Sequence, residues 1–133
     1  QDILQEEKVD MVLCGHSHCY ERSRPLTFKP AGKDQALKLN PDGTVDGIIN
    51  TDPKFDGVKV TKANGVIHIV TGGGGANLYV KDPTYKAGEG NDYMPKFVAD
   101  RHSLTVLDIK GKELKFKQLD EDGKIIDQIT LEK

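Results

Sequence analysis

Tryptophan is absent from this sequence of 133 residues, and tyrosine and phenylalanine supply only four residues each. Because sugar-binding surfaces stack their ligands on aromatic rings, this composition does not favour a carbohydrate-binding module. The sequence also lacks a dense run of lysine or arginine, and its formal net charge is only −2, so a nucleic acid is not an expected partner. No apolar stretch approaches the roughly 20 residues of a membrane-spanning helix.

Cysteine is also scarce, with only Cys14 and Cys19 present. Two cysteines are too few for a disulfide framework, and Cys14 ends an apolar run in which a small buried thiol fits well. We therefore expect two free thiols.

The length of the chain suits one domain that buries about two-thirds of the surface of its unfolded state. The first residue is Gln1, and the sequence that follows has neither an initiating methionine nor the pattern of a signal peptide. We interpret this start as an internal cut in a longer protein.

The first part of the chain predicts an α/β arrangement. Residues 1–8 are rich in helix formers, and residues 9–14 form a short apolar run typical of a strand covered on both faces. A glycine loop follows at residues 15–18. In α/β sheets, ligands bind at the carboxyl ends of the strands, where this loop falls.

The remainder of the chain predicts further strands. Residues 24–64 are polar and rich in turns, and we expect short strands there at residues 45–50 and 58–61. Residues 65–71 predict a buried strand that enters a run of four glycines, and residues 81–101 predict a loop. The last three strands are expected at residues 103–109, 113–119 and 124–131, joined by short hairpins.

His16 and His18 are the candidate metal ligands. In an extended or turning segment, a spacing of two residues sends both imidazoles to one side. Neutral imidazole binds transition metals well, and Gly15 would permit the backbone conformation that brings the segment to its site. The same pattern also fits two ordinary loop histidines.

The surrounding residues resemble a known family. The motif and the tail after it read Gly15-His16-Ser17-His18-Cys19-Tyr20-Glu21-Arg22-Ser23. Together with the strand at residues 9–13, they resemble the final metal-binding motif of purple acid phosphatases. These enzymes are a type of calcineurin-like metallophosphoesterase. The strand and glycine turn at residues 66–75, and the strand at residues 103–109, are similar to later parts of the same family.

The resemblance implies a dinuclear metal centre of Fe with Zn, Mn or Fe that hydrolyses phosphate esters. It assigns His16 to the more exchangeable metal and His18 to the iron-type metal. The other metal ligands of the family lie in an aspartate motif, a Gly-Asp motif, a Gly-Asn-His motif and a further histidine, none of which occurs in this sequence. Two histidines cannot hold two metals. We therefore expect this chain to be inactive alone.

Several other residues are weaker candidates. Glu21 and Arg22 either pair to brace the loop at residues 15–18 or are ordinary surface charges, while Gly15 and Tyr20 are candidates for supporting the metal ligands or lining the pocket. His68 fits a structural role in a strand. His102 is either at the pocket mouth or in a solvated loop. The four glycines either turn N–H groups towards a phosphate or form a plain tight turn.

Two other classes of function remain open. Cys14, His16, His18 and Cys19 are all zinc-ligand types, but four ligands within six residues would strain a closed structural site. A β-rich interaction domain with incidental histidines also fits the last three strands. These two alternatives predict a small zinc-binding module or a binding module without phosphatase activity.

The sequence thus predicts an α/β fold, the C-terminal part of a four-layer α/β/β/α metallophosphoesterase sandwich that is β-rich in this chain. Residues 1–133 would form the C-terminal portion of the catalytic domain: a helix, strand and motif at 1–23, an irregular insertion at 24–64 and a β-rich tail at 65–133. The expected partners are the N-terminal part of that domain and a phosphate ester, and the family resemblance indicates a secreted or periplasmic protein. Exposed sheet edges predict self-association, which a strictly monomeric species in sedimentation at high concentration would contradict.

Overall fold

A computed structural model of the chain describes residues 1–32, 37, 39–79 and 93–133. One short helix, α1 (Asp2–Glu6), precedes the strands of this described part, which run in chain order. They are β1 (Met11–Cys14), β2 (Tyr20–Arg22), β3 (Leu26–Pro30), β4 (Gly47–Thr51), β5 (Ile67–Thr71), β6 (Lys96–Val98), β7 (Ser103–Lys110), β8 (Glu113–Asp120) and β9 (Ile125–Glu132). Among these residues, no helix is long and apolar enough to cross a membrane.

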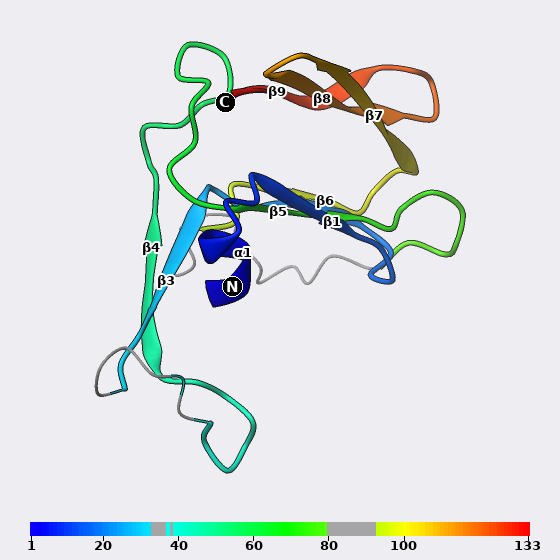
Figure 1. Cartoon of the computed structure of the whole chain (residues 1–133). Helices are drawn as coiled ribbons and strands as arrows, with labels where there is room; N and C mark the ends of the chain where they lie inside the picture. The colour runs from blue at the N-terminus through cyan, green and yellow to red at the C-terminus, as the bar shows by residue number, and fades with distance from the viewer. Residues whose placement is uncertain (33–36, 38, 80–92) are drawn as a thin grey trace.

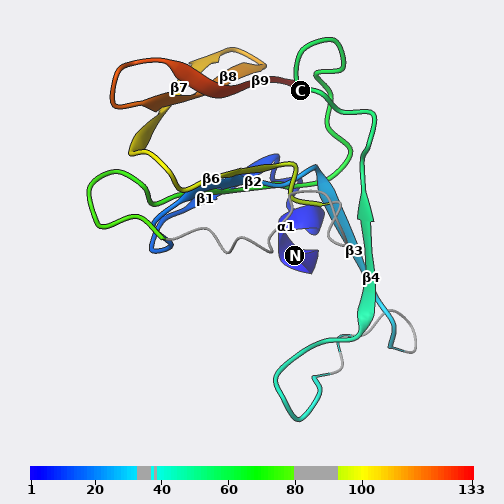
Figure 2. The ribbon, with the colours of Figure 1, turned by 180° about the vertical axis from the view of Figure 1, so that it is seen from behind.

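The strands form a layered arrangement. A mixed sheet has the order β1-β5-β2-β6, in which β1 runs parallel to β5 while β2 runs antiparallel to β5 and β6. The antiparallel sheet β7-β8-β9 stacks on one face of this mixed sheet, and α1 lies on the other (Figures 1 and 2). The order of layers is therefore helix, sheet, sheet.

The hydrophobic core fills the space between the two sheets. Its buried members come from the mixed sheet, from the segment before β5 and from the C-terminal strands: Tyr20, Phe55, Ile67, Ile69, Phe116, Ile129 and Leu131. The rings of Tyr20 and Phe116 stack across the layers, with centroids 6.2 Å apart. On β8, Phe116 is buried whereas Lys115 and Lys117 are exposed, because successive residues of a strand point to opposite faces of its sheet.

The C-terminal strands agree with the prediction to within one residue at each end. Their hairpins are antiparallel and pair in continuous register except for an irregularity between Gln118 and Leu119. The predicted strand at residues 65–71 is also confirmed, although it begins later, at Ile67. The predicted strand near residues 45–50 corresponds to β4.

The prediction of a strand at residues 58–61 was wrong. The Asp56 carboxylate accepts hydrogen bonds from the backbone N–H groups of Val58, Lys59 and Val60, and these bonds hold the segment in a turn. The partner of β4 is instead β3, which was not predicted, and the two form a two-stranded antiparallel sheet that projects away from the layers (Figure 1). Part of the predicted loop at residues 81–101 lies outside the described residues, and its end contains β6.

The prediction that β1 is covered on both faces was also wrong for this chain. Met11 and Val12 are half-buried, while Leu13 and Cys14 are exposed, because β1 is an edge strand of the mixed sheet. Cys14 is therefore not the buried thiol that the sequence predicts, whereas Cys19 is buried, and both are free.

Strand β7 is an edge strand with an apolar surface. Leu104, Val106 and Ile109 are 53%, 41% and 66% exposed, so apolar side chains of this strand face solvent in the chain as described. Since a free edge also offers unpaired backbone groups, β7 combines the two features that favour pairing with a further strand.

Candidate functional site

Residues 15–19 form a tight loop between β1 and β2, at the carboxyl end of β1. We call it the motif loop. The Ser17 N–H bonds to the Gly15 carbonyl at 3.0 Å, and the Cys19 N–H bonds to the Ser17 carbonyl at 2.8 Å. His16 has φ of 74°, in the left-handed region that a residue other than glycine seldom adopts. Gly15 does not take this conformation, and space is open around its α-carbon, so its role in bringing the segment to a metal stays a prediction.

The His18 ring is held by contacts with the segment that follows the four glycines. Its Nδ1 lies 2.8 Å from the Asn77 carbonyl oxygen, and its ring stacks on Tyr79 with centroids 5.1 Å apart. The Tyr79 N–H in turn donates to the His18 carbonyl at 3.1 Å. A carbonyl can only accept, so we assign the proton of neutral His18 to Nδ1. This leaves the Nε2 lone pair available to bind a metal.

The first of the four glycines packs against the motif loop. A Cβ atom on Gly72 would lie 2.0 Å from the Ser17 carbonyl oxygen, so this close approach excludes any side chain. The Gly72 N–H also donates to the Cys19 carbonyl at 3.1 Å. This N–H points to the motif loop and is not free for a phosphate, which corrects that interpretation for Gly72.

A Gly72→Ala variant tests this contact. The clash is with backbone, which cannot move as a flexible side chain does, so we expect a loss of about 1–3 kcal/mol in the free energy of unfolding. Gly75→Ala is the matched control, because nothing lies within 4 Å of the Cβ position there. Urea denaturation of both variants measures the difference, and equal stabilities would contradict the proposed contact.

The two other histidines have defined surroundings. The His68 ring points to the α1 side of the mixed sheet, with Nε2 2.7 Å from the Gln1 side-chain oxygen, while Ile67 and Ile69 face the core. Burial lowers the His68 pKa, and the positive N-terminal amine adds to this effect. These contacts agree with a structural role. His102 is exposed, and its Nδ1 lies 3.0 Å from the Gly73 carbonyl oxygen, beside the motif loop rather than in open solvent.

The residues after the motif do not pair with one another. Successive residues of β2 point to opposite faces, so Glu21 and Arg22 do not pair with each other, and Arg22, which is 8% exposed, is not an ordinary surface charge either. Arg22 instead pairs with Asp127 of β9, and Tyr20 donates to the same carboxylate. Glu21 interacts with the Cys19 thiol, whose pKa rises to about 11 through burial and then through the negative charge of Glu21.

The described residues contain no group of three or more His, Cys, Asp or Glu side chains arranged to hold a metal ion. Cys14, His16, His18 and Cys19 all lie within these residues. The four side chains therefore do not form the closed zinc site of the first alternative. Burial of Cys19 agrees with this result, because its thiol is enclosed whereas His16 is exposed.

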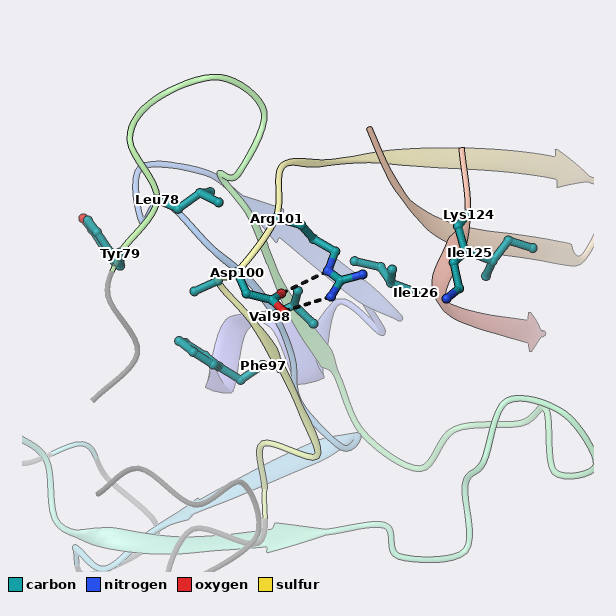
Figure 3. A pocket seen from close by; sticks show the side chains of 10 residues that line it. Leu78, Tyr79, Phe97, Val98, Asp100, Arg101, Lys124, Ile125 and Ile126 are labelled. Carbon is teal, nitrogen blue, oxygen red and sulfur yellow. Dashed lines mark hydrogen bonds and ion pairs between the residues drawn. The ribbon is translucent and has the colours of Figure 1, made fainter. Parts of the chain in front are cut away.

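An open cleft of about 680 Å³ lies beside Tyr79 (Figure 3). Its walls come from the segment that ends at Tyr79, from β6 and the residues directly after it, and from the turn into β9: Leu78, Tyr79, Phe97, Val98, Ala99, Asp100, Arg101, Lys124, Ile125 and Ile126. The Arg101 guanidinium bonds to the Asp100 carboxylate at 2.9 and 3.0 Å and approaches the Asp120 carboxylate at 3.7 Å. The cleft thus adjoins the His18 ring through Tyr79, and its walls are mainly apolar with a charged centre.

Three residues of the site were not predicted. The carbonyl of Asn77 and the ring of Tyr79 position His18, yet no residue-type pattern signals a backbone carbonyl. Asp127 did leave a signal. Asp127 lies on the same buried face of β9 as Ile129 and Leu131. A carboxylate is unusual in such a place without a partner.

Comparison with known proteins gave related sequences but no matching model of a protein family. An uncharacterized protein of Mycobacterium tuberculosis is 35% identical over 75 residues, which cover 56% of this chain and 12% of that protein. A protein of Arabidopsis thaliana named probable inactive purple acid phosphatase 1 is 29% identical over 139 residues, covering the whole chain and 18% of its own length. The chain therefore spans less than a fifth of each of these relatives.

A solved structure has the same fold. It is a purple acid phosphatase, PPD1, from seeds of yellow lupin (Lupinus luteus), and it superimposes with a TM-score of 0.61 at 23% identity. The match covers 98% of this chain and 19% of the lupin protein. The resemblance to purple acid phosphatases and the β-rich form of the fold are therefore confirmed.

Proposed function

We propose that this chain is the C-terminal portion of the catalytic domain of a purple acid phosphatase-type enzyme that hydrolyses phosphate monoesters. Residues 1–23 would supply the helix, strand and metal motif, residues 24–64 an insertion and residues 65–133 the β-rich tail. The observation that carries the proposal is the orientation of His18, whose Nδ1 is engaged by the Asn77 carbonyl at 2.8 Å and whose Nε2 is left as a metal ligand.

The donor set of the motif fits part of a dinuclear centre. His18 is oriented by its partners, and His16 is exposed without a ring hydrogen bond to any described residue. These imidazoles would each hold one metal, of Fe with Zn, Mn or Fe. When bound, such a metal pair lowers the pKa of water and neutralises phosphate oxygens. The two histidines act as ligands and not as acid or base.

The remaining ligands would come from a preceding part of the catalytic domain, because the described residues offer no third ligand beside the two histidines. The chain alone is then inactive. The short coverage of the relatives, 12% to 19% of their lengths, supports a longer protein with such a part. Self-association through the exposed edge of β7 stays a prediction, as does a secreted or periplasmic location.

Metal analysis of the complete gene product that carries this chain tests the proposal. We expect two metal ions per chain and hydrolysis of p-nitrophenyl phosphate, because both metals are needed to bind and activate the reacting groups. A variant with Cys14→Ser and Cys19→Ser is the control, and it should keep its metal. Loss of metal from that variant, or an upstream sequence without the aspartate, Gly-Asp and Gly-Asn-His motifs, would contradict the proposal.

The name of the Arabidopsis relative suggests a second candidate function. A relative that is named as probably inactive and that matches the whole chain in sequence suggests a phosphatase-like protein without turnover. The same experiment separates the two functions. Hydrolysis supports the enzyme, whereas a folded product that does not hydrolyse the ester supports the inactive form.

A further inference from the structure

The Asp127 carboxylate lies between the two sheets and binds two residues of β2. It accepts the Tyr20 hydroxyl at 2.6 Å, and it accepts the Arg22 guanidinium through two bonds, Nε to Oδ2 at 2.6 Å and Nη2 to Oδ1 at 3.2 Å. Tyr20 is 0% exposed, Arg22 8% and Asp127 7%. We refer to these three residues as the intersheet triad.

The charges of the intersheet triad are balanced inside the protein. Burial by itself would raise the pKa of Asp127, but the hydrogen bonds and charge of Arg22, with the Tyr20 hydroxyl, hold it below its usual value. Burial and the charge of Asp127 raise the pKa of Tyr20, so its hydroxyl remains a donor. The Lys96 ammonium, half-exposed, lies 3.9 Å from the same carboxylate. No described buried side-chain N or O atom is left without a partner.

The triad lies directly beyond the motif loop. β2 begins at Tyr20, two residues after His18, and its three residues pair with only three residues of β5 and three of β6. So short a strand has few ladder bonds to fix its position. The loop runs directly into β2, and its last residue, Cys19, accepts the N–H of Gly72, which follows β5, at 3.1 Å. The position of β2 therefore fixes one end of the loop.

We infer that Asp127 is a positioning residue for the metal-binding motif, because it anchors β2 to the C-terminal sheet and thereby holds the loop that carries His16 and His18. A purely stabilising role does not require charge at this place, since apolar residues of similar volume often replace a buried ion pair without loss of stability. The bidentate geometry of Arg22 on one carboxylate instead fixes direction as well as distance. The part of this inference that concerns metal rests on the proposed function, whereas the part that concerns the loop does not.

Hydrogen exchange of this chain without metal tests the inference. In Asp127→Ala, we expect the protection of the Gly72 and Tyr79 amides to fall by about tenfold or more, since their acceptors are the carbonyls of Cys19 and His18. Amides of the central strand β8 should change much less. Asp10→Ala is the control, because it removes an exposed carboxylate that pairs with Lys133 at 3.0 Å. Equal loss of protection in β8, or no loss at Gly72 and Tyr79, would overturn the inference.

Asp127→Ala leaves Arg22 buried without its partner, and an unpaired buried charge is by itself enough to destabilise the whole chain. A second variant, Tyr20→Phe with Arg22→Met and Asp127→Leu, replaces the triad by apolar side chains. We expect this variant to fold and to show the same selective loss at Gly72 and Tyr79. A loop as protected as in the original chain, or a failure of both variants to fold, would show that the triad has no local positioning role.

Zinc titration of this chain adds a readout on the histidines themselves. The imidazole ¹⁵N resonances of His16 and His18 report both the tautomer and the binding of Zn²⁺. The triple variant should weaken Zn²⁺ binding about tenfold or more, as expected for loss of groups that orient ligands. If the complete gene product binds no metal while the exchange result holds, the proposed function fails and the positioning role stands. If Zn²⁺ binds with equal affinity to the original chain and to the triple variant, the positioning role for the metal motif fails.

Discussion

A His18→Ala variant of the complete gene product is expected to lose at least about 100-fold in the hydrolysis of p-nitrophenyl phosphate. Loss of a group that merely orients a metal ligand lowers metal affinity or activity roughly 10–100-fold, and removal of the ligand itself should lower activity more. His18 is the imidazole that the structure orients most closely, between the Asn77 carbonyl at 2.8 Å and the Tyr79 ring. Metal content should fall from two ions per chain towards one, which elemental analysis of the purified variant measures.

His68→Gln is the matched control for this prediction. His68 lies on the opposite side of the mixed sheet, where its ring bonds to Gln1 at 2.7 Å. The variant removes one imidazole from the same sheet without touching the motif loop, so both hydrolysis and metal content should be retained. Equal losses in the two variants would show that His18 acts through stability, and full activity of His18→Ala would exclude His18 as a ligand.

Phe116→Ala is expected to lower the free energy of unfolding by about 3–5 kcal/mol, the usual cost of removing a buried aromatic ring. Phe116 is 0% exposed and stacks on Tyr20 across the two sheets, so no nearby surface group can fill the space. Urea denaturation of the original chain and of the variant gives the difference, provided that the dependence of the free energy of unfolding on urea concentration has the same slope in both.

Leu104→Ala on β7 is the control for the core. Leu104 is 53% exposed, so truncation removes little buried area and should cost within about 0.5 kcal/mol. A comparable loss in both variants would contradict the assignment of the core to the space between the sheets. It would instead indicate that the outer face of β7 is covered in solution.

The C-terminal sheet was predicted well because its signals are local. The alternation of apolar and charged side chains in β8, together with short turns on both sides, determines where each strand begins and ends. The same reasoning found β5 from its β-branched run. For these strands, a few neighbouring residues contain enough information.

Strands β2, β3 and β6 were not predicted because they are short and their sequences are not distinctly apolar or alternating. β2 and β6 have three residues each, and they exist as strands because β5 and one another supply the hydrogen bonds. The false strand at residues 58–61 shows the reverse effect. There a β-branched pattern was overruled by the Asp56 side chain, which binds three successive N–H groups.

The sequence by itself determined the two candidate ligands, His16 and His18, and the resemblance to purple acid phosphatases, because both depend on residue types at close spacing. Only the tertiary structure showed that His16 takes the left-handed conformation, that Gly72 contacts the motif loop and that Asp127 anchors β2. The physical reason is distance along the chain. The partner of Arg22 lies 105 residues away, and that of the His18 ring 59 residues away, so only the packing of the sheets brings these groups together.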